Sequence, residues 1–429
     1  MKKGYGRNYW ALTFEGTFFI GGIVVLSTGG VVALYINTMT GSNTLIGLAI
    51  TLQALLMSLG QLLGAPYLNS IRKLPEFLFK TMAVQRTIPL LMAIPLFLGV
   101  SGYLSVTIFL ILFALFWFFD GAITLYWGEL CARALKPDLR GHMMGIQTTL
   151  GGFLQLLAGL LIAWLLATPT LNDNIRYAII FVLGGIMFLM TVVFIRLVRD
   201  PSPILKPEKV NVKQFYDKIP SIIRHSKPLK QIIIARLPSY IGFASVSFLV
   251  VFGVNALTIS DAQVSWLVYA NIIGGIISGV LLGEASRRYG NRAVILLCNF
   301  GVVIAMCMAV LLAYNPSLGY VWLFAICMLG SLTASNWFGY FNYFIDIAPV
   351  KERSAYQLIG QAIGIPFSFA GVAMGAVIDI HGYVTTFIIC GIFAFITCLF
   401  SIRLLSKKKM AVLAAENSVS ESLEEEDEK

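Results

Sequence analysis

The sequence predicts an all-α membrane protein with twelve transmembrane helices in two six-helix halves. We expect a pseudo-two-fold axis to relate the halves and both termini to be cytoplasmic. Three observations predict this fold: the composition, the length of the apolar runs and an asymmetry of charge. Hydrophobic residues make up 58% of the 429 positions and charged residues 12%, about half the charged share of a soluble domain. This composition excludes an ordinary soluble protein.

Twelve apolar stretches are long enough to cross a bilayer, which takes roughly 20 mostly apolar residues. We predict helices because lipid cannot satisfy exposed backbone groups, and because the runs are too long for the strands of a barrel. The predicted spans are 9–37, 44–68, 77–98, 105–128, 143–166, 176–198, 232–256, 263–283, 292–314, 320–344, 356–378 and 384–405.

The first apolar run is much longer than the hydrophobic region of a signal peptide, so we expect it to stay as the first helix. The cysteines lie in or beside the spans and are expected to pack there, without a disulfide framework. They are residues 131, 298, 307, 327, 390 and 398. No metal-ligand spacing and no phosphate-binding loop occurs, and we expect neither a metal nor a cofactor.

The basic residues fall on one side of the predicted membrane. The loops assigned to the other side are free of Lys and Arg; they lie near 38–43, 99–104, 167–175, 257–262, 315–319 and 379–383. Because basic loops stay in the cytoplasm, the asymmetry predicts cytoplasmic termini in a cytoplasmic membrane. The net charge of +10 is therefore interpreted as a topology signal with lipid contacts, and no nucleic-acid partner is expected.

A proline-rich polar stretch divides the chain six helices to six. The predicted parts are a cytoplasmic N-terminus at 1–8, an N-terminal bundle at 9–198, a linker at 199–231, a C-terminal bundle at 232–405 and a tail at 406–429. The tail ends in an acidic run that we expect to be disordered; partner binding by the tail is the alternative.

The two halves also repeat each other at an offset of 215 residues. The matches are Gly60 with Gly275, Gly64 with Gly279, Arg72 with Arg287, and Lys73 with Arg288. In each half a GxxxG pair near the end of the second helix is followed by a basic turn. GxxxG by itself indicates only close helix packing, but four matches at one offset favour duplication. We expect all four glycines to lie where helices touch.

Two loop motifs follow this pattern. The turn after the second helix of each half includes Gly64, Arg72 and Lys73 in the first copy, and Gly283, Arg288, Gly290 and Arg292 in the second. The turn after the fourth helix carries Glu129, Pro137, Arg140 and Gly141 in the first copy, and Asp346, Pro349 and Arg353 in the second. With these motifs the chain resembles the major facilitator superfamily over about residues 9–405. Both copies of the first motif lack its usual acid; Arg287 stands in that place in the second.

The resemblance implies a secondary active transporter, not an enzyme, that moves a small organic solute by alternating access. Its expected partners are a small-molecule substrate, protons and the lipid bilayer, and we expect a monomer. Three alternatives stay open: efflux of drugs or amphiphiles, flipping of a lipid-linked substrate, and a transport-dead sensor or scaffold. The Gly-Pro signature of drug–proton antiporters is absent from the fifth predicted span. This absence weakens the case for drug efflux.

Charged residues inside spans are costly and are candidates for function. Glu15, Arg86 and Asp120 lie at similar depth in the first, third and fourth spans. They are candidates for proton coupling, with Glu15 expected nearer to water; the alternative is a structural ion pair. Arg236 lies closer to the membrane boundary. Glu129 and Asp346 fall at helix ends, where they are expected to hold loops through Arg133, Arg140 or Arg353.

Aromatic and amide residues form a second candidate set. Trp117 and Thr124 share a face of the fourth span with Asp120. The substrate-cavity candidates are Trp117, Thr124, Asn336, Trp337, Tyr340 and Gln361. Aromatics at the membrane interface are the competing interpretation, strongest for Trp127 and Tyr343.

Overall fold

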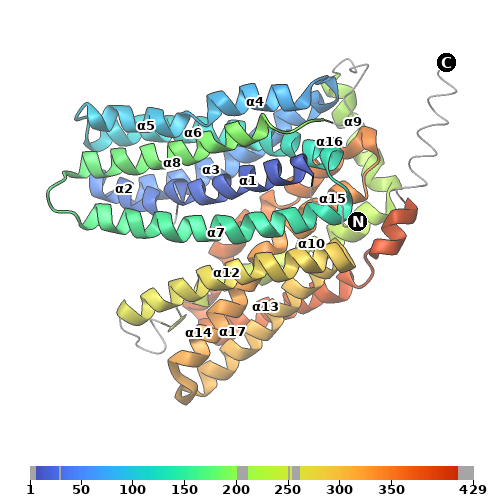
Figure 1. Cartoon of the computed structure of the whole chain (residues 1–429). Coiled ribbons are helices and arrows are strands. Elements are labelled where there is room, and N and C mark those ends of the chain that lie inside the picture. The colour runs from blue at the N-terminus through green and yellow to red at the C-terminus, as the bar shows by residue number, and fades with distance from the viewer. Residues whose placement is uncertain (1–5, 29, 201–210, 250–251, 254–260, 414–429) are drawn as a thin grey trace. The chain divides into compact units, whose positions relative to one another are not determined.

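The computed structural model describes residues 6–28, 30–200, 211–249, 252–253 and 261–413 (Figure 1). Three predicted features lie partly outside these residues: the N-terminus before residue 6, the linker segment 201–210, and the acidic tail from 414 onward. The end of the predicted seventh span is also outside. All regular structure within the described residues is helical.

The chain forms two compact units. The first comprises residues 1–136 and 150–211, and the second comprises residues 137–149 and 212–429. The change of unit at Asn211 falls inside the predicted linker. The predicted bundles differ from these units at one place, because the first turns of the fifth span group with the second unit.

The first unit has α1, α2, α3, α4, α5, α6, α8 and the later part of α7. The bounds are α1 Arg7–Gly22, α2 Val31–Thr40, α3 Asn43–Gly64, α4 Leu74–Gln85, α5 Ile88–Phe97, α6 Gly102–Ala134, α7 Pro137–Ala167 and α8 Asp173–Ile195, with the 3-10 turns η1 Ile23–Leu26 and η2 Ala65–Ser70. α3 packs along α6, and α8 packs along both α1 and α5. Aromatic rings of α2, α6 and α8 fill its core, where Phe109 and Phe181 stack at 5.3 Å.

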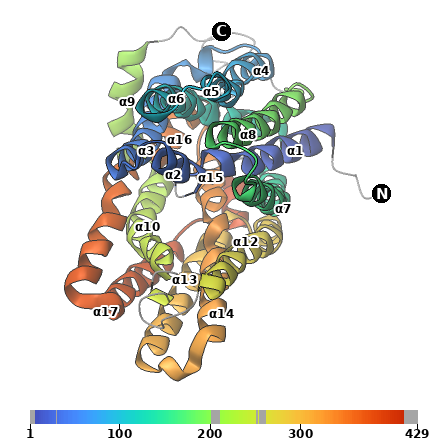
Figure 2. The same ribbon diagram turned by 90° about the vertical axis from the view of Figure 1, so that its left-hand side faces the viewer.

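The second unit contains the remaining helices. Their bounds are α9 Val212–His225, α10 Lys227–Ala244, α12 Asp261–Tyr289, α13 Asn291–Tyr314, α14 Gly319–Ser331, α15 Asn336–Asp346, α16 Arg353–Ala362 and α17 Ala370–Ser401, with the 3-10 turns η3 Ser245–Phe248, η4 Pro316–Leu318, η5 Leu332–Ser335, η6 Val350–Glu352 and η7 Ile365–Phe369. α17 packs against both α10 and α13, as Figure 2 shows for this unit.

Ten helical stretches of the described residues are long and apolar enough to cross a membrane, where the sequence predicted twelve spans. The predicted eleventh span is divided between α16 and α17 by the 3-10 turn that contains Pro366. Proline cannot donate a backbone hydrogen bond, so the α-helix is interrupted there. Gly382, at φ +80°, breaks α17 between the predicted eleventh and twelfth spans.

Close glycine contacts hold helix pairs together inside each unit. A Cβ on Gly60 of α3 would lie 1.8 Å from the Phe118 carbonyl oxygen of α6. A Cβ on Gly279 of α12 would lie 2.4 Å from the Gly145 carbonyl oxygen of α7. Gly64 also faces α6, but the prediction for Gly275 was wrong, because no described atom lies within 4 Å of its Cβ position. Its neighbour Gly274 makes the contact instead, with α14.

Candidate functional site

A buried ion pair joins α4 to α6 in the first unit. Arg86 follows the last residue of α4, and Pro89 in the first turn of α5 prevents a continuous helix there. One terminal nitrogen of Arg86 lies 2.9 Å from Oδ1 of Asp120, and each side chain is only 3% exposed. The structure thus brings two of the three predicted charges together.

The guanidinium of Arg86 is surrounded by aromatic rings. It lies 4.4 Å from the centre of the Phe19 ring and 5.4 Å from that of Phe188. The Gln85 amide lies 3.2 Å from the Phe116 carbonyl oxygen, to which it donates a hydrogen bond. Ring faces attract a cation more strongly where water is excluded. The arginine is therefore held by its surroundings as well as by Asp120.

Glu15 is the third charge of this set. The Trp127 indole nitrogen donates a hydrogen bond of 2.7 Å to its Oε2 atom. Among the described residues, no basic nitrogen lies within 4.0 Å of the Glu15 carboxylate, although Arg86 acts on it electrostatically. Glu15 is 3% exposed, against 2% for Asp120. Both carboxylates are almost completely buried, and the prediction that Glu15 lies nearer to water stays a prediction.

The aromatic candidates of α6 have ordinary surroundings. Trp117 packs in the hydrophobic core against the Phe116 ring at 5.5 Å. The Thr124 hydroxyl donates to the Asp120 carbonyl oxygen of its own helix. Trp127 was interpreted as an interface aromatic and is instead a partner of Glu15. Sequence spacing places both tryptophans on one face of α6, but it does not tell which one meets a carboxylate.

In the second unit, three aromatic rings surround Arg236 of α10. Its guanidinium lies 5.0 Å from the Tyr340 ring centre, 5.4 Å from that of Tyr240 and 5.6 Å from that of Phe344. The sequence placed Arg236 closer to the membrane boundary than the three charges of the first unit, and in the structure it lies in the third turn of α10. The sequence signal for this site was a lone arginine two turns into an apolar helix.

The other substrate-cavity candidates of the second unit differ in burial and in their contacts. Tyr340 is 2% exposed and belongs to the Arg236 set, whereas Trp337 is 43% exposed. Asn336 begins α15, and its buried Oδ1 atom has no hydrogen-bond partner in the described part of the chain. Gln361 is half-buried on α16. Tyr343 is fully buried, and its hydroxyl accepts a hydrogen bond from the Leu405 backbone nitrogen; it is not an interface aromatic.

Comparisons with known proteins agree on the fold. A profile of the Major Facilitator Superfamily matches residues 232–425. No curated protein sequence matches the chain. The proton:xylose symporter XylE is a structural neighbour, with a TM-score of 0.71 over 95% of this chain and 98% of its own at 14% identity. The chain has the fold of the major facilitator superfamily.

Two other solved structures of similar fold extend this comparison. The E. coli fucose:proton symporter FucP is 13% identical, with a TM-score of 0.66 over 92% of this chain and 97% of its own. The human organic anion transporter MFSD10 is 11% identical, with a TM-score of 0.67 over 92% and 99%. At these identities the likeness shows the fold alone.

In the loop motif of the second unit, an acidic residue at a neighbouring position pairs with the arginines. Arg287 occupies the usual place of the acid, and Glu284 pairs with it at 2.6 Å and also with Arg288. Gly290 adopts φ +86° between α12 and α13, a conformation that favours glycine. In the first copy Arg72 and Lys73 are exposed, and Lys73 pairs weakly with Glu76 at 3.6 Å.

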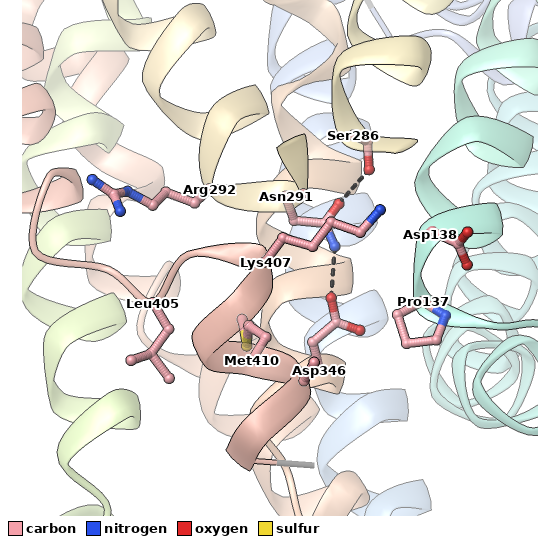
Figure 3. Close-up of a pocket in the computed structure, with 11 residues that line it drawn as sticks. Pro137, Asp138, Ser286, Asn291, Arg292, Asp346, Leu405, Lys407 and Met410 are labelled. Atoms are coloured by element: carbon pink, nitrogen blue, oxygen red, sulfur yellow. Dashed lines mark hydrogen bonds between the residues drawn. The ribbon is translucent and has the colours of Figure 1, made fainter. Parts of the chain in front are cut away.

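The second superfamily motif forms a buried network. Arg140 lies 2.6 Å from Oδ1 of Asp346, and Asn291 donates to Oδ2 of the same carboxylate at 2.7 Å. Ser286 donates in turn to Asn291 (Figure 3). Arg353 acts on Asp346 electrostatically. A Cβ on Gly141 would lie 1.8 Å from the Ser286 hydroxyl oxygen, so only glycine lets Arg140 approach this network.

A pocket of about 210 Å³ adjoins the network (Figure 3). Arg292 and Lys407 contribute positive charge to its wall, and Asp138 and Asp346 contribute negative charge. In the corresponding motif of the first unit, Glu129 pairs with Arg133 at 2.8 Å. Arg133 also lies 3.3 Å from Asp200.

Proposed function

We propose that this protein is a secondary active transporter that moves a small organic solute across the cytoplasmic membrane, coupled to protons. The fold supports transport by alternating access of two units. The proton:xylose and fucose:proton symporters share that fold, which supports the choice of protons. The observation that carries the proposal is the buried set of Glu15, Arg86 and Asp120.

The charge of this set supports proton coupling. Two carboxylates share one arginine, so the set has a net charge of −1 when both acids are ionised. One added proton makes it neutral. A medium of low dielectric favours the neutral set, whereas exposure to water stabilises the charged one. Alternating exposure to the two sides would therefore load and release a proton.

The contacts favour Glu15 as the proton carrier. Asp120 is committed to Arg86 and is also 3.5 Å from the Gln85 amide. Glu15 accepts a hydrogen bond from Trp127, and no basic group of the described residues lies within ion-pair range of it. Protonation of Glu15 therefore leaves the Arg86–Asp120 pair intact. In this proposal Asp120 is the counter-ion of Arg86, and Glu15 exchanges the proton.

The test uses purified protein in liposomes that contain a trapped pH-sensitive dye. Members of five solute classes are added in turn without a pH gradient: sugars, amino acids, nucleosides, organic anions and drugs. We expect one class to change the internal pH as it enters, and an imposed pH gradient to drive its accumulation. Uptake that neither moves protons nor responds to the gradient would contradict proton coupling. Binding without any uptake would instead favour the transport-dead alternative.

A further inference from the structure

The charge of Arg236 has no counter-ion within the part of the chain that the structure describes. Its guanidinium stays charged at any physiological pH. Among the described residues, no carboxylate oxygen lies within 4.0 Å of its nitrogens. This contrasts with Arg86 in the first unit, whose charge is met by Asp120 at 2.9 Å. A charge inside an apolar helix bundle normally has a partner, and the side chain of Arg236 is half-buried and therefore reachable.

The surrounding aromatic rings stabilise the charge of Arg236 only in part. Tyr240, Tyr340 and Phe344 place their ring centres 5.0–5.6 Å from the guanidinium carbon. Ring faces attract a cation but accept no strong hydrogen bond from its in-plane N–H groups. The Tyr240 hydroxyl is also a hydrogen-bond partner of Arg236, but a neutral phenol carries no negative charge to balance the guanidinium. A planar guanidinium presents these groups as a fork that matches a carboxylate. The rings also offer apolar surface beside the charge.

One face of α16 adds amide groups to this region. Gln357, Gly360 and Gln361 are spaced i, i+3 and i+4, which places them on a single face, and Gly364 follows just beyond the helix end at Ala362. A Cβ on Gly360 would meet the Phe344 ring, and one on Gly364 would meet the Tyr240 hydroxyl.

The two glycines thus turn this face toward the rings around Arg236. Gln357 is 3% exposed, and neither its amide nitrogen nor its amide oxygen has a hydrogen-bond partner in the described structure. Buried amides without partners are rare in proteins. An amide donor on this face and an arginine without a described carboxylate partner suit an anion that accepts from both.

We propose that Arg236, with the Gln357 amide, binds the carboxylate of a small organic anion whose apolar body lies on the surrounding rings. The proposal rests on the proposed transport function and names its substrate class. It assigns recognition to the second unit and leaves the proton to Glu15 of the first.

The test is binding to the purified protein in detergent, by thermal shift and calorimetry at constant ionic strength. The probes are three acids with their neutral amides: benzoate and benzamide, nicotinate and nicotinamide, lactate and lactamide. We expect at least one acid to stabilise the wild type and its amide to have little effect. Arg236→Gln should weaken that binding about 10- to 100-fold, the range for a lost hydrogen bond to a charged group. Arg236→Lys should fall between them, because lysine keeps the charge and loses the fork.

Arg196→Gln is the matched control, because Arg196 also lies over a ring, Phe79, at 5.1 Å, but on an exposed helix end. It should bind the acid like the wild type. Wild-type protein that binds none of the acids, or an Arg236→Gln variant that binds them unchanged, would overturn the proposal. If Arg236→Gln does not fold, acid binding is measured for Gln357→Leu and Arg236→Lys instead. Unchanged binding by both variants would overturn the proposal. Because binding needs no proton movement, loss of coupling with intact binding would count against the proposed function alone.

Discussion

Trp127 of α6 donates its indole N–H to Glu15 of α1, at 2.7 Å. This bond links α6, the helix that carries Asp120, directly to the second carboxylate. It fixes the position of the carboxylate oxygen inside the first unit. The geometry makes Trp127 a positioning residue for proton exchange.

Replacing Trp127 tests this role. Trp127→Phe keeps a ring and removes the donor, and a hydrogen bond to a charged group is worth about 1.5–3 kcal/mol. We expect proton-driven accumulation to fall at least tenfold, while solute exchange without a pH gradient stays near the wild-type rate. Trp10→Phe is the control, because Trp10 is 42% exposed. Equal activity of the two variants would show that the bond does not serve coupling.

The Arg86–Asp120 pair should dominate the stability of the first unit. Removing one partner of a buried ion pair costs about 3–5 kcal/mol, so Arg86→Ala should unfold at a clearly lower temperature. The double variant Arg86→Ala with Asp120→Asn should recover part of that loss, because no charge is left unpaired. Thermal unfolding in detergent measures both. A double variant no more stable than Arg86→Ala would mean that the pair is not the source of the loss.

The α7–α12 contact gives a pair of matched glycine substitutions on one helix. A Cβ on Gly279 would lie 2.3 Å from the Thr149 hydroxyl oxygen, whereas the Cβ position of Gly275 has no described atom within 4 Å. Gly279→Ala should therefore cost about 1–3 kcal/mol through overpacking. Gly275→Ala should be neutral or stabilising by up to about 1 kcal/mol. Equal unfolding temperatures for the two variants would contradict this helix contact.

Orientation in the membrane is tested by labelling single cysteines in intact cells, in a Cys307→Ser background. Cysteine at Ser101 or Asn315 should react with an impermeant thiol reagent from outside. Cysteine at Lys73 or Lys409 should react only after the cells are opened. All four positions are exposed in the structure. The reverse pattern would place the basic loops outside and contradict the charge-based topology.

The sequence could predict which segments are apolar helices and at what depth the charged residues lie within them. Glu15, Arg86 and Asp120 were identified because each interrupts an apolar run at similar depth. The rotation of a helix about its axis was harder to predict, because apolar residues surround these helices on all sides. This is why Trp127 was not recognised as the partner of Glu15, and why Gly275 was preferred to Gly274 as a contact.

Long-range pairing was also beyond the sequence pattern. The loop motif appeared to lack an acid because the expected position holds Arg287, whereas Glu284, three residues earlier on α12, provides the charge. Asp346 had several possible partners in the sequence. The structure pairs it with Arg140 because Gly141 allows the close approach of α7 to α12.

The most direct test of the account measures solute-driven proton movement for Glu15→Gln and Asp120→Asn side by side in proteoliposomes. Glu15→Gln should abolish proton movement and leave solute exchange intact, because the amide cannot take up a proton and the Arg86–Asp120 pair is untouched. Asp120→Asn should lower stability and rate, while the protein that remains folded still moves protons with solute. Full pH-driven accumulation by Glu15→Gln would contradict the assignment of Glu15 as the proton carrier.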